Sequence, residues 1–130
     1  VFDRLHHHNV VLECMILKPS MVISGTTCSE QASVEEVAEA TLHVLRRTVP
    51  AAVPTVNFLS GGQSAEVATA HLEAMNQSST PKPWNLSFSY GRALQAPALE
   101  AWGGKADNVK AAQAKLIERM KANSHASIAK

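Results

Sequence analysis

The sequence of 130 residues has few cysteines, no long hydrophobic run and almost no excess of either charge. Cys14 and Cys28 are too few for a disulfide scaffold and lack the spacing of a zinc site, so we expect reduced thiols. Lys and Arg total 12 against 11 Asp and Glu, a balance that argues against a nucleic-acid partner held by bulk charge. The longest apolar stretch, residues 10–17, is interrupted by Glu13 and is too short to cross a membrane.

The composition does provide enough hydrophobic residues, 45% of the chain, to bury a core. A length of 130 residues suits one ordinary domain and leaves no room for two. The first residue is Val1 rather than Met, so we expect the start of the natural protein to be missing. Reduced thiols favour a cytoplasmic protein, although a targeting segment before Val1 would not be visible here.

One pattern occurs three times along the chain: a short apolar strand, a turn with Gly or Ser, and an amphipathic helix. We expect strands at residues 9–18, 55–59 and 84–89, helices that begin near Ser33 and Ser64, and further helices at residues 93–102 and 107–122. Ser33 with Glu36 three residues later forms a capping box, which marks a helix start. The residues after Asn123 are small and polar, and we expect them to fray.

Each long helix carries an apolar stripe at helical spacing, which predicts the face that it buries. The expected inward residues are Val34, Val37, Ala38, Leu42 and Leu45 in the first helix, Val67, His71, Leu72 and Met75 in the second, and Val109, Ala112, Leu116 and Met120 in the last.

Strands that alternate with helices indicate an α/β protein with a parallel sheet and helices on its outside. Three such units could form a small open sheet, or they could be part of a (β/α)8 TIM barrel, which is longer than this chain. Val1–Leu5 resembles the last turns of a helix already under way. We therefore interpret residues 1–130 as the C-terminal portion of a single barrel domain, with roughly its last three βα units.

Polar residues follow all three predicted strands, at the end where a parallel barrel places its site. Lys18 could simply extend to solvent, or it could be an amine nucleophile whose pKa is lowered by desolvation or a neighbouring cation. The glycines of Ser60-Gly61-Gly62 and Gly91-Arg92 could likewise be simple turns. Two such loops on consecutive strands, an arginine and a helix that begins at Gly91 together favour a phosphate site.

His6, His7 and His8 are consecutive, which raises the question of a metal site. Successive residues on a helix point about 100° apart, so the three imidazoles cannot jointly face one ion. Because no other His or carboxylate spacing typical of a metal site is present, we predict no metal site.

The three strand ends read Leu17-Lys18-Pro19-Ser20-Met21-Val22, Phe58-Leu59-Ser60-Gly61-Gly62-Gln63-Ser64 and Phe88-Ser89-Tyr90-Gly91-Arg92-Ala93-Leu94. Three further segments are Arg46-Arg47-Thr48-Val49-Pro50, Lys82-Pro83-Trp84 and Ala101-Trp102-Gly103-Gly104. In this order, the set resembles class I fructose-1,6-bisphosphate aldolase over nearly the whole chain. One departure is Cys14, where many family members carry Gly, and we attach no function to it.

The resemblance implies a (β/α)8 barrel that reversibly cleaves fructose 1,6-bisphosphate into dihydroxyacetone phosphate and glyceraldehyde 3-phosphate. It implies that Lys18 forms a Schiff base with the keto carbon of the substrate. The residues that it assigns to phosphate binding are Leu59, Ser60, Gly61, Gly91 and Arg92. It also implies that no metal or cofactor is needed, because the protonated imine accepts the electrons of the broken bond.

The same resemblance implies a homotetramer in glycolysis and gluconeogenesis. The family takes its general acid/base from strands upstream of Val1, and a proton-transfer tyrosine from a tail beyond Lys130. We therefore expect the 130-residue segment alone to be inactive. Two rival hypotheses are a non-catalytic phosphosugar-binding or scaffold fragment of the same barrel, and a different Schiff-base lyase or transaldolase; the ordered motifs disfavour the second.

Overall fold

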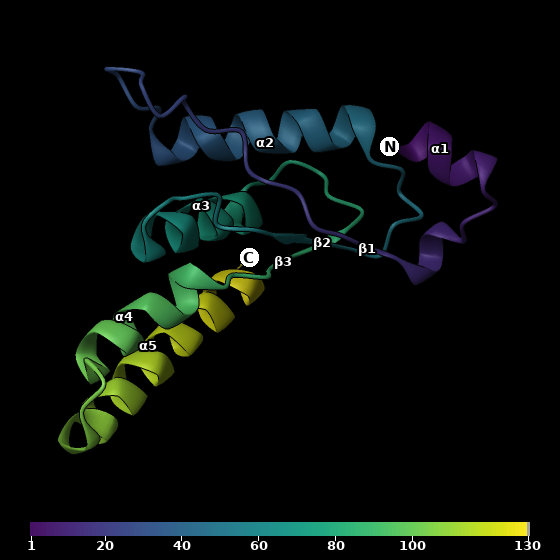
Figure 1. The fold of residues 1–130 in the computed structure, drawn as a ribbon. Coiled ribbons are helices and arrows are strands. Elements are labelled where there is room, and N and C mark those ends of the chain that lie inside the picture. The colour runs from purple at the N-terminus through teal and green to yellow at the C-terminus, as the bar shows by residue number, and fades with distance from the viewer. Residues whose placement is uncertain (130) are drawn as a thin grey trace.

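Parallel strands in the order β1-β2-β3 organise the chain in the computed structural model, which describes residues 1–129 (Figure 1). The strands are β1 (Ile16–Leu17), β2 (Thr55–Phe58) and β3 (Asn85–Phe88). The helices are α1 (Phe2–His7), α2 (Val34–Thr48), α3 (Ala65–Gln77), α4 (Arg92–Trp102) and α5 (Val109–Ile128), with 3-10 turns at Leu12–Cys14 and Ala106–Asn108. The alternation of strand and helix and the parallel sheet are as predicted.

The two faces of the sheet differ in burial, as period-2 alternation requires. Val56, Phe58 and Leu86 are almost completely buried on one face. On the other face, Asn85 is exposed, and Thr55 pairs with it across the β2–β3 register. Helices therefore cover one face only, which is the arrangement of strands and helices in a barrel wall.

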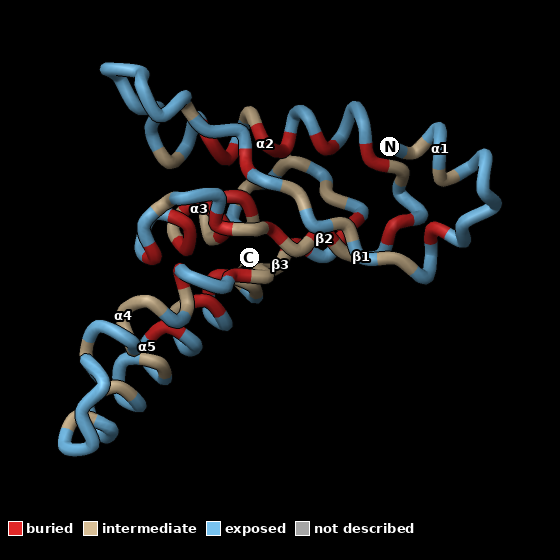
Figure 2. The backbone as a smooth tube through the Cα atoms, viewed as in Figure 1, coloured by how far each residue is buried: buried red, intermediate tan, exposed pale blue. Residues whose placement is uncertain are grey.

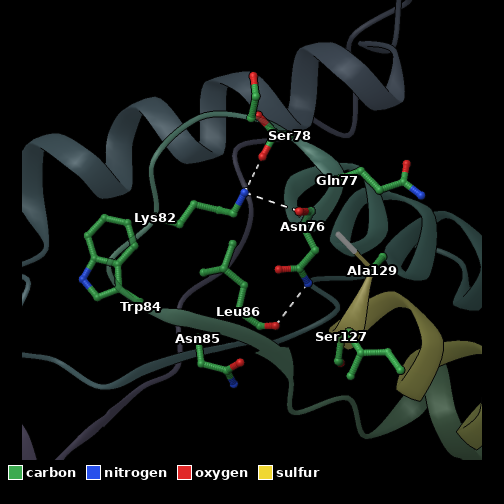
Figure 3. Close-up of a pocket in the computed structure, with 11 residues that line it drawn as sticks. Asn76, Gln77, Ser78, Lys82, Trp84, Asn85, Leu86, Ser127 and Ala129 are labelled. Carbon is green, nitrogen blue, oxygen red and sulfur yellow. Dashed lines mark hydrogen bonds between the residues drawn. The ribbon is translucent and has the colours of Figure 1, made fainter.

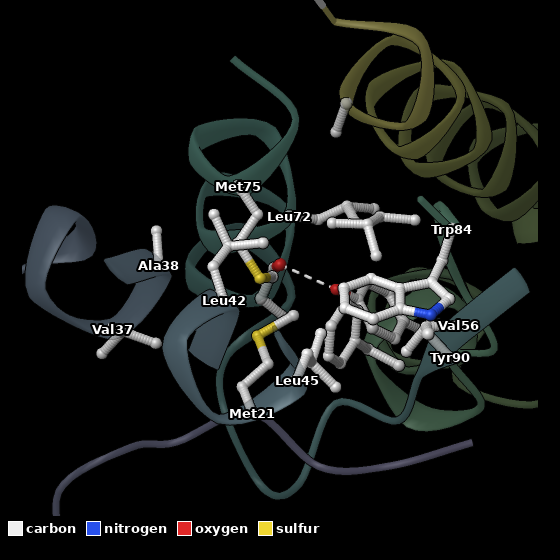
Figure 4. Close-up of a cluster of buried hydrophobic side chains, with 14 of the residues drawn as sticks. Met21, Val37, Ala38, Leu42, Leu45, Val56, Leu72, Met75, Trp84 and Tyr90 are labelled. Atoms are coloured by element: carbon white, nitrogen blue, oxygen red, sulfur yellow. Dashed lines mark hydrogen bonds between the residues drawn. The ribbon is translucent and has the colours of Figure 1, made fainter. Parts of the chain in front are cut away.

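The core lies between the covered face of the sheet and helices α2 and α3 (Figures 2 and 4). Leu42 of α2 and Leu72 and Met75 of α3 are each at most 2% exposed, and each contributes about 1.5–3 kcal/mol of hydrophobic stabilisation. Trp84 anchors the start of β3, since its indole N–H donates to the carbonyl oxygen of Pro50 at 3.0 Å. Helix α3 packs against both α2 and α5, so it is the central helix of the layer.

The helix boundaries expected from capping residues are confirmed. The Glu36 N–H donates to Ser33 Oγ at 3.2 Å, and the Ser33 N–H donates to Glu36 Oε2 at 2.7 Å, which completes the capping box. Ser64 caps α3 by accepting the Val67 N–H at 3.2 Å. Helix α4 ends at Gly103, whose φ of +55° is a left-handed conformation that glycine adopts without strain.

The first strand is much shorter than the predicted residues 9–18. Asn9 has a φ of +52°, and the Val10 N–H donates back to the Leu5 carbonyl at 3.0 Å. These features form a Schellman motif at the end of α1, so residues 9–10 terminate a helix instead of starting a strand. A 3-10 turn at Leu12–Cys14 then leaves only Ile16–Leu17 to pair with β2.

Three of the predicted inward residues prove to be largely exposed: Val67 (43%), Val109 (42%) and Met120 (52%). For Met120, the reason is that polar side chains on the neighbouring positions of α5 fill the contact with α3. Arg119 is 6% exposed and Asn123 is fully buried, and both interact with Thr69 of α3. Hydrophobic periodicity misplaces the buried face where hydrogen-bonded polar residues fill it.

Helix α5 also continues past the residues that we expected to fray. It extends to Ile128, and Ala126 is completely buried. The Ala126 carbonyl accepts a hydrogen bond from Asn76 Nδ2 at 2.9 Å, and Ser127 Oγ lies 3.3 Å from Ser87 Oγ on β3. These tertiary contacts hold the last turns in place. No helix within residues 1–129 combines the length and the apolar character needed to span a membrane.

Candidate functional site

The carboxyl ends of all three strands lie at one edge of the sheet. The Leu59 N–H donates to the Pro19 carbonyl at 3.0 Å, and the Ser89 N–H donates to the Phe58 carbonyl at 2.7 Å. Lys18 immediately precedes the first of these links, and Gly91 follows the second by two residues. The structure therefore brings the strand ends with the predicted site residues together.

The loop Ser60-Gly61-Gly62, which follows β2, has backbone N–H groups that are free to bind an anion. Gly61 and Gly62 have φ values of +61° and +83°, which other residues adopt only with strain. A side chain at Gly61 would also lie 3.3 Å from Leu59 Cδ1 and 3.9 Å from Ser20 Cβ, so the loop packs against the residues after Lys18. Among residues 1–129, no group accepts the N–H of Ser60, Gly61 or Gly62.

The second loop contributes the amino end of α4. Gly91 occupies the N-cap position, and its carbonyl accepts the N–H groups of Leu94 and Gln95 at 3.1 and 3.0 Å. The N–H groups of Arg92 and Ala93 have no acceptor in the described part of the chain. These free donors and the positive end of the helix dipole favour a bound anion.

The two cations at this edge, Lys18 and Arg92, are both exposed. Neither takes part in an ion pair with any residue of the described range 1–129. Two unpaired cations beside free backbone N–H groups produce a positive local potential, which attracts phosphate. Ile16 pairs with Thr55 and points to the open face of the sheet, whereas Leu17 pairs with Val56 on the covered face. Because side chains alternate along a strand, Lys18 points to the open face, as Ile16 does.

Three side chains behind these loops, those of Gln63, His71 and Tyr90, were not recognised as site residues in the sequence. Gln63 Nε2 donates to the Ser60 carbonyl at 2.7 Å, and Gln63 Oε1 lies 2.5 Å from Nδ1 of buried His71. The sequence feature that could have predicted a role for Gln63 is its position directly after Gly61 and Gly62. His71, which we predicted to be an inward residue of its helix, is indeed 4% exposed, and its burial lowers the pKa of the imidazole against the opposing effect of Glu35.

Tyr90 is the third such residue, and it directly precedes Gly91 in the second loop. Its hydroxyl donates to the Ala68 carbonyl of α3 at 2.7 Å, the bond drawn as a dashed line in Figure 4. The ring is 6% exposed, and this burial raises the pKa of the hydroxyl although the positive charge of Arg119 acts in the opposite direction. Tyr90 therefore remains a neutral hydrogen-bond donor at physiological pH.

A cavity of about 750 Å³ lies behind the first loop, between it and the long connection from β1 to α2. Its lining includes Gly61, Gln63 and His71 on one side and Ile23, Cys28 and Val34 on the other. The cavity shows that the loop is not packed tightly from behind. On this side, the hydrogen bonds of Gln63 to the Ser60 carbonyl contribute to its shape.

A second pocket, about 430 Å³, lies at the opposite end of the strands and is shown in Figure 3. It contains Lys82, whose Nζ donates to the Ser78 carbonyl at 2.5 Å and to the Asn76 carbonyl at 3.4 Å. These carbonyls end α3, so Lys82 caps the helix. Desolvation lowers the pKa of Lys82, but the residue is at the wrong end of the sheet to join the site.

The consecutive histidines lie on α1 and its end, and all three are exposed. Across the described residues, no group of three or more His, Cys, Asp or Glu side chains is arranged to hold a metal ion. Cys14 and Cys28 are free thiols and both are exposed.

The chain matches known proteins over its whole length. The family model for fructose-bisphosphate aldolase class I matches residues 1–130. Fructose-bisphosphate aldolase B of Ovis aries is 56% identical over 127 residues, and the muscle-type aldolase of Lethenteron camtschaticum is 56% identical over 126 residues. These matches cover 98% and 97% of this chain and 35% of each relative.

Among solved structures, a fructose-bisphosphate aldolase from Plasmodium falciparum, in complex with TRAP and a small-molecule inhibitor, superimposes with a TM-score of 0.94 at 48% identity. The match covers 100% of this chain and 37% of that structure's chain. The chain thus spans about a third of the length of the relatives that it matches.

Proposed function

The chain belongs to the class I fructose-bisphosphate aldolase family, and from this premise we propose that it supplies the Schiff-base lysine and the phosphate loops of such an enzyme. The expected α/β fold, part of a (β/α)8 TIM barrel, is confirmed by the parallel strands and the structural match. We infer that residues 1–130 are the C-terminal portion of one barrel domain.

The reaction proposed for the complete protein is the reversible cleavage of fructose 1,6-bisphosphate into dihydroxyacetone phosphate and glyceraldehyde 3-phosphate. The observation that carries the proposal is the meeting of Lys18 with two anion-binding loops at one edge of the sheet. A lysine is unnecessary in a site that only binds phosphate at this edge. A nucleophile beside a phosphate site suits covalent capture of a phosphorylated ketone.

In this proposal, Lys18 Nζ attacks the keto carbon as a neutral amine, and loss of water gives a protonated imine. When the C3–C4 bond breaks, its electron pair moves to the imine nitrogen and forms an enamine. The C4 hydroxyl loses its proton and becomes the aldehyde oxygen of the departing product. Protonation of the enamine carbon and hydrolysis then release dihydroxyacetone phosphate and regenerate Lys18.

The phosphate groups would be held by Leu59, Ser60 and Gly61 on one side and by Gly91 and Arg92 on the other. Free backbone N–H groups in both loops, together with the guanidinium of Arg92, support this assignment. Because the imine accepts the electrons, the chemistry needs no metal ion or cofactor. We infer that the general acid/base, the oligomeric contacts of a homotetramer and the cytoplasmic setting belong to the complete protein.

A non-catalytic phosphosugar-binding role is the second candidate. It is favoured by one observation: both phosphate loops are formed within this chain, independently of Lys18 chemistry. In that case the loops would bind phosphorylated sugars, and Lys18 would attract the anion without forming a covalent bond.

Borohydride trapping separates the two candidates. In the complete polypeptide that carries this chain, borohydride added with dihydroxyacetone phosphate should reduce the imine to a stable secondary amine on Lys18, which peptide mapping can locate. Lys18→Met should abolish the adduct, whereas Lys82→Met should leave it unchanged. An adduct on another lysine that survives in Lys18→Met would show that the nucleophile is wrongly assigned, and binding without any adduct would support the non-catalytic role.

A further inference from the structure

We propose that Gln63 and His71 are positioning residues that hold the loop of residues 60–62 in the shape that receives a phosphate group. The inference rests on the proposed phosphate-binding function of this loop. It concerns side chains on the cavity side of the loop, behind the groups that would contact the substrate.

The first step of the argument is the double anchor on the Ser60 carbonyl. This oxygen accepts the Gln63 backbone N–H at 3.1 Å and the Gln63 side-chain Nε2 at 2.7 Å. The two bonds close the turn around Gly61 and Gly62 and keep the carbonyl on the side of Gln63. With the carbonyl held there, the loop's N–H groups stay free for an anion.

The second step is the contact that orients the Gln63 amide. Gln63 Oε1 lies 2.5 Å from Nδ1 of His71. An amide oxygen only accepts hydrogen bonds, so Nδ1 of the imidazole must carry a proton. The imidazole thereby fixes which end of the amide faces Ser60. Without this donor, the amide could rotate and present its oxygen to the Ser60 carbonyl, which would repel it.

The third step concerns why packing cannot replace these hydrogen bonds. His71 is 4% exposed and is held rigidly in α3, but Gln63 is only partly buried and lines the cavity of about 750 Å³. On its cavity side, the loop is therefore supported by the hydrogen bond from Gln63 to His71, with a weaker contact from Gln63 Nε2 to the sulfur of buried Met21 at 3.7 Å. One turn earlier in α3, the Ala68 carbonyl anchors Tyr90 before the second loop, so α3 supports both loops of the site.

The test measures affinity for dihydroxyacetone phosphate by calorimetry, and kcat and KM for fructose 1,6-bisphosphate, in the complete polypeptide. His71→Leu keeps an apolar side chain in the buried position but removes the donor, and should weaken binding by about 2- to 13-fold, the value of one hydrogen bond, with little change in kcat. His71→Asn places an amide N–H where Nδ1 lies and should retain most of the affinity. His43→Leu, on the exposed side of α2, is the matched control and should have no effect.

Two further variants test the connection rather than the histidine alone. Gln63→Leu should weaken binding as His71→Leu does, and the double variant should be no weaker than either single one, because both remove the same chain of bonds. Since Gln63 is partly exposed, this variant also provides the test if His71→Leu fails to fold.

Unchanged affinity in His71→Leu and Gln63→Leu would overturn the positioning role, as would additive effects in the double variant. An Asn variant as weak as the Leu variant would show that the donor is not the cause, with the same consequence. If the unmodified protein binds no phosphorylated sugar, the proposed function itself fails and the positioning role with it, a result distinguishable from all the others.

Discussion

At the scale of single residues, the site depends on groups left free by the rest of the chain. Lys18 and Arg92 have no ion-pair partner among residues 1–129, while Lys82, Lys115 and Arg119 are each bonded to other groups of the protein. Charges that are already neutralised or engaged with carbonyls cannot attract a substrate. Lys18 and Arg92 are distinguished by being free of such partners and by lying at the carboxyl ends of the strands, where a phosphorylated ligand would meet them.

Removing the arginine of the second loop tests this interpretation. In the complete polypeptide, Arg92→Ala should weaken binding of dihydroxyacetone phosphate by about 10- to 150-fold, since a hydrogen bond to a charged group contributes ~1.5–3 kcal/mol. Borohydride trapping at saturating ligand should still label Lys18. The control is Arg47→Ala, an exposed arginine in the last turn of α2. Equal affinities of Arg92→Ala and the unmodified protein would place the phosphate elsewhere.

At the scale of secondary structure elements, helix starts position the loops. Helix α3 begins with its Ser64 cap directly after the first loop, and α4 begins at Gly91 within the second. Helix α2 begins at the Ser33 capping box and packs on α3, so the three helices form one layer behind the strand ends. The geometry of the loops therefore depends on where each helix starts.

The capping box is the helix start that can be tested without touching the site. Ser33→Ala removes the acceptor of the Glu36 N–H and should lower the free energy of unfolding by about 1 kcal/mol. Hydrogen exchange should accelerate selectively at the amides of the first turn of α2. Ser79→Ala, an exposed serine in the loop before β3, should change neither quantity. Unaltered exchange in α2 would mean that the packing of α2 on α3 alone sets its start.

At the scale of the whole molecule, the sheet has one face covered by helices and one open. The open face carries Asn85, Thr55 and Ile16, and Ile16 is 62% exposed. In a closed barrel such residues face the barrel interior. Since the chain spans about a third of its relatives' length, a complete barrel requires further strands to close the wall.

A consequence for the complete protein concerns metal ions. If the imine of Lys18 accepts the electrons of the cleaved bond, cleavage of fructose 1,6-bisphosphate should survive an excess of EDTA, with activity within experimental error of the untreated protein. A zinc-dependent aldolase assayed in parallel would serve as the positive control for chelation. Loss of activity that zinc specifically restores would contradict the proposed role of Lys18.

Much of this molecule could be predicted from local sequence signals. The starts of α2 and α3 follow from Ser33 and Ser64, because a capping hydrogen bond involves residues only three positions apart. The order of strands and helices follows from apolar runs separated by turn residues. The six proposed site residues remain a prediction: Lys18 and the loops with Ser60-Gly61 and Gly91-Arg92 follow from their place after the strands, whereas Leu59 follows only from the resemblance to the aldolase family.

Other features depend on contacts between residues distant in the sequence. Arg119 and Asn123 are buried only because Thr69 and the Ala65 carbonyl, about 50 positions earlier, provide partners for them. The link between Gln63 and His71 depends on how the loop folds back onto α3. Hydrophobic periodicity does not predict either contact. In the sequence, a buried polar residue that forms its hydrogen bonds with distant residues cannot be distinguished from an exposed polar residue.

The sequence by itself therefore determined which elements form, where most of the helices begin and which residues end the strands, because short-range hydrogen bonds and side-chain alternation control these features. Only the tertiary structure decided that the first strand shrinks to Ile16–Leu17, that α5 runs to Ile128 and that α3 supports both loops. For the end of α5 and the support of the loops, the physical reason is the same: the free energy of a buried polar group depends on whether a partner reaches it, and that partner comes from another part of the chain. The first strand is short for a local reason, since backbone hydrogen bonds at the end of α1 and in the 3-10 turn take residues 9–14 out of the strand.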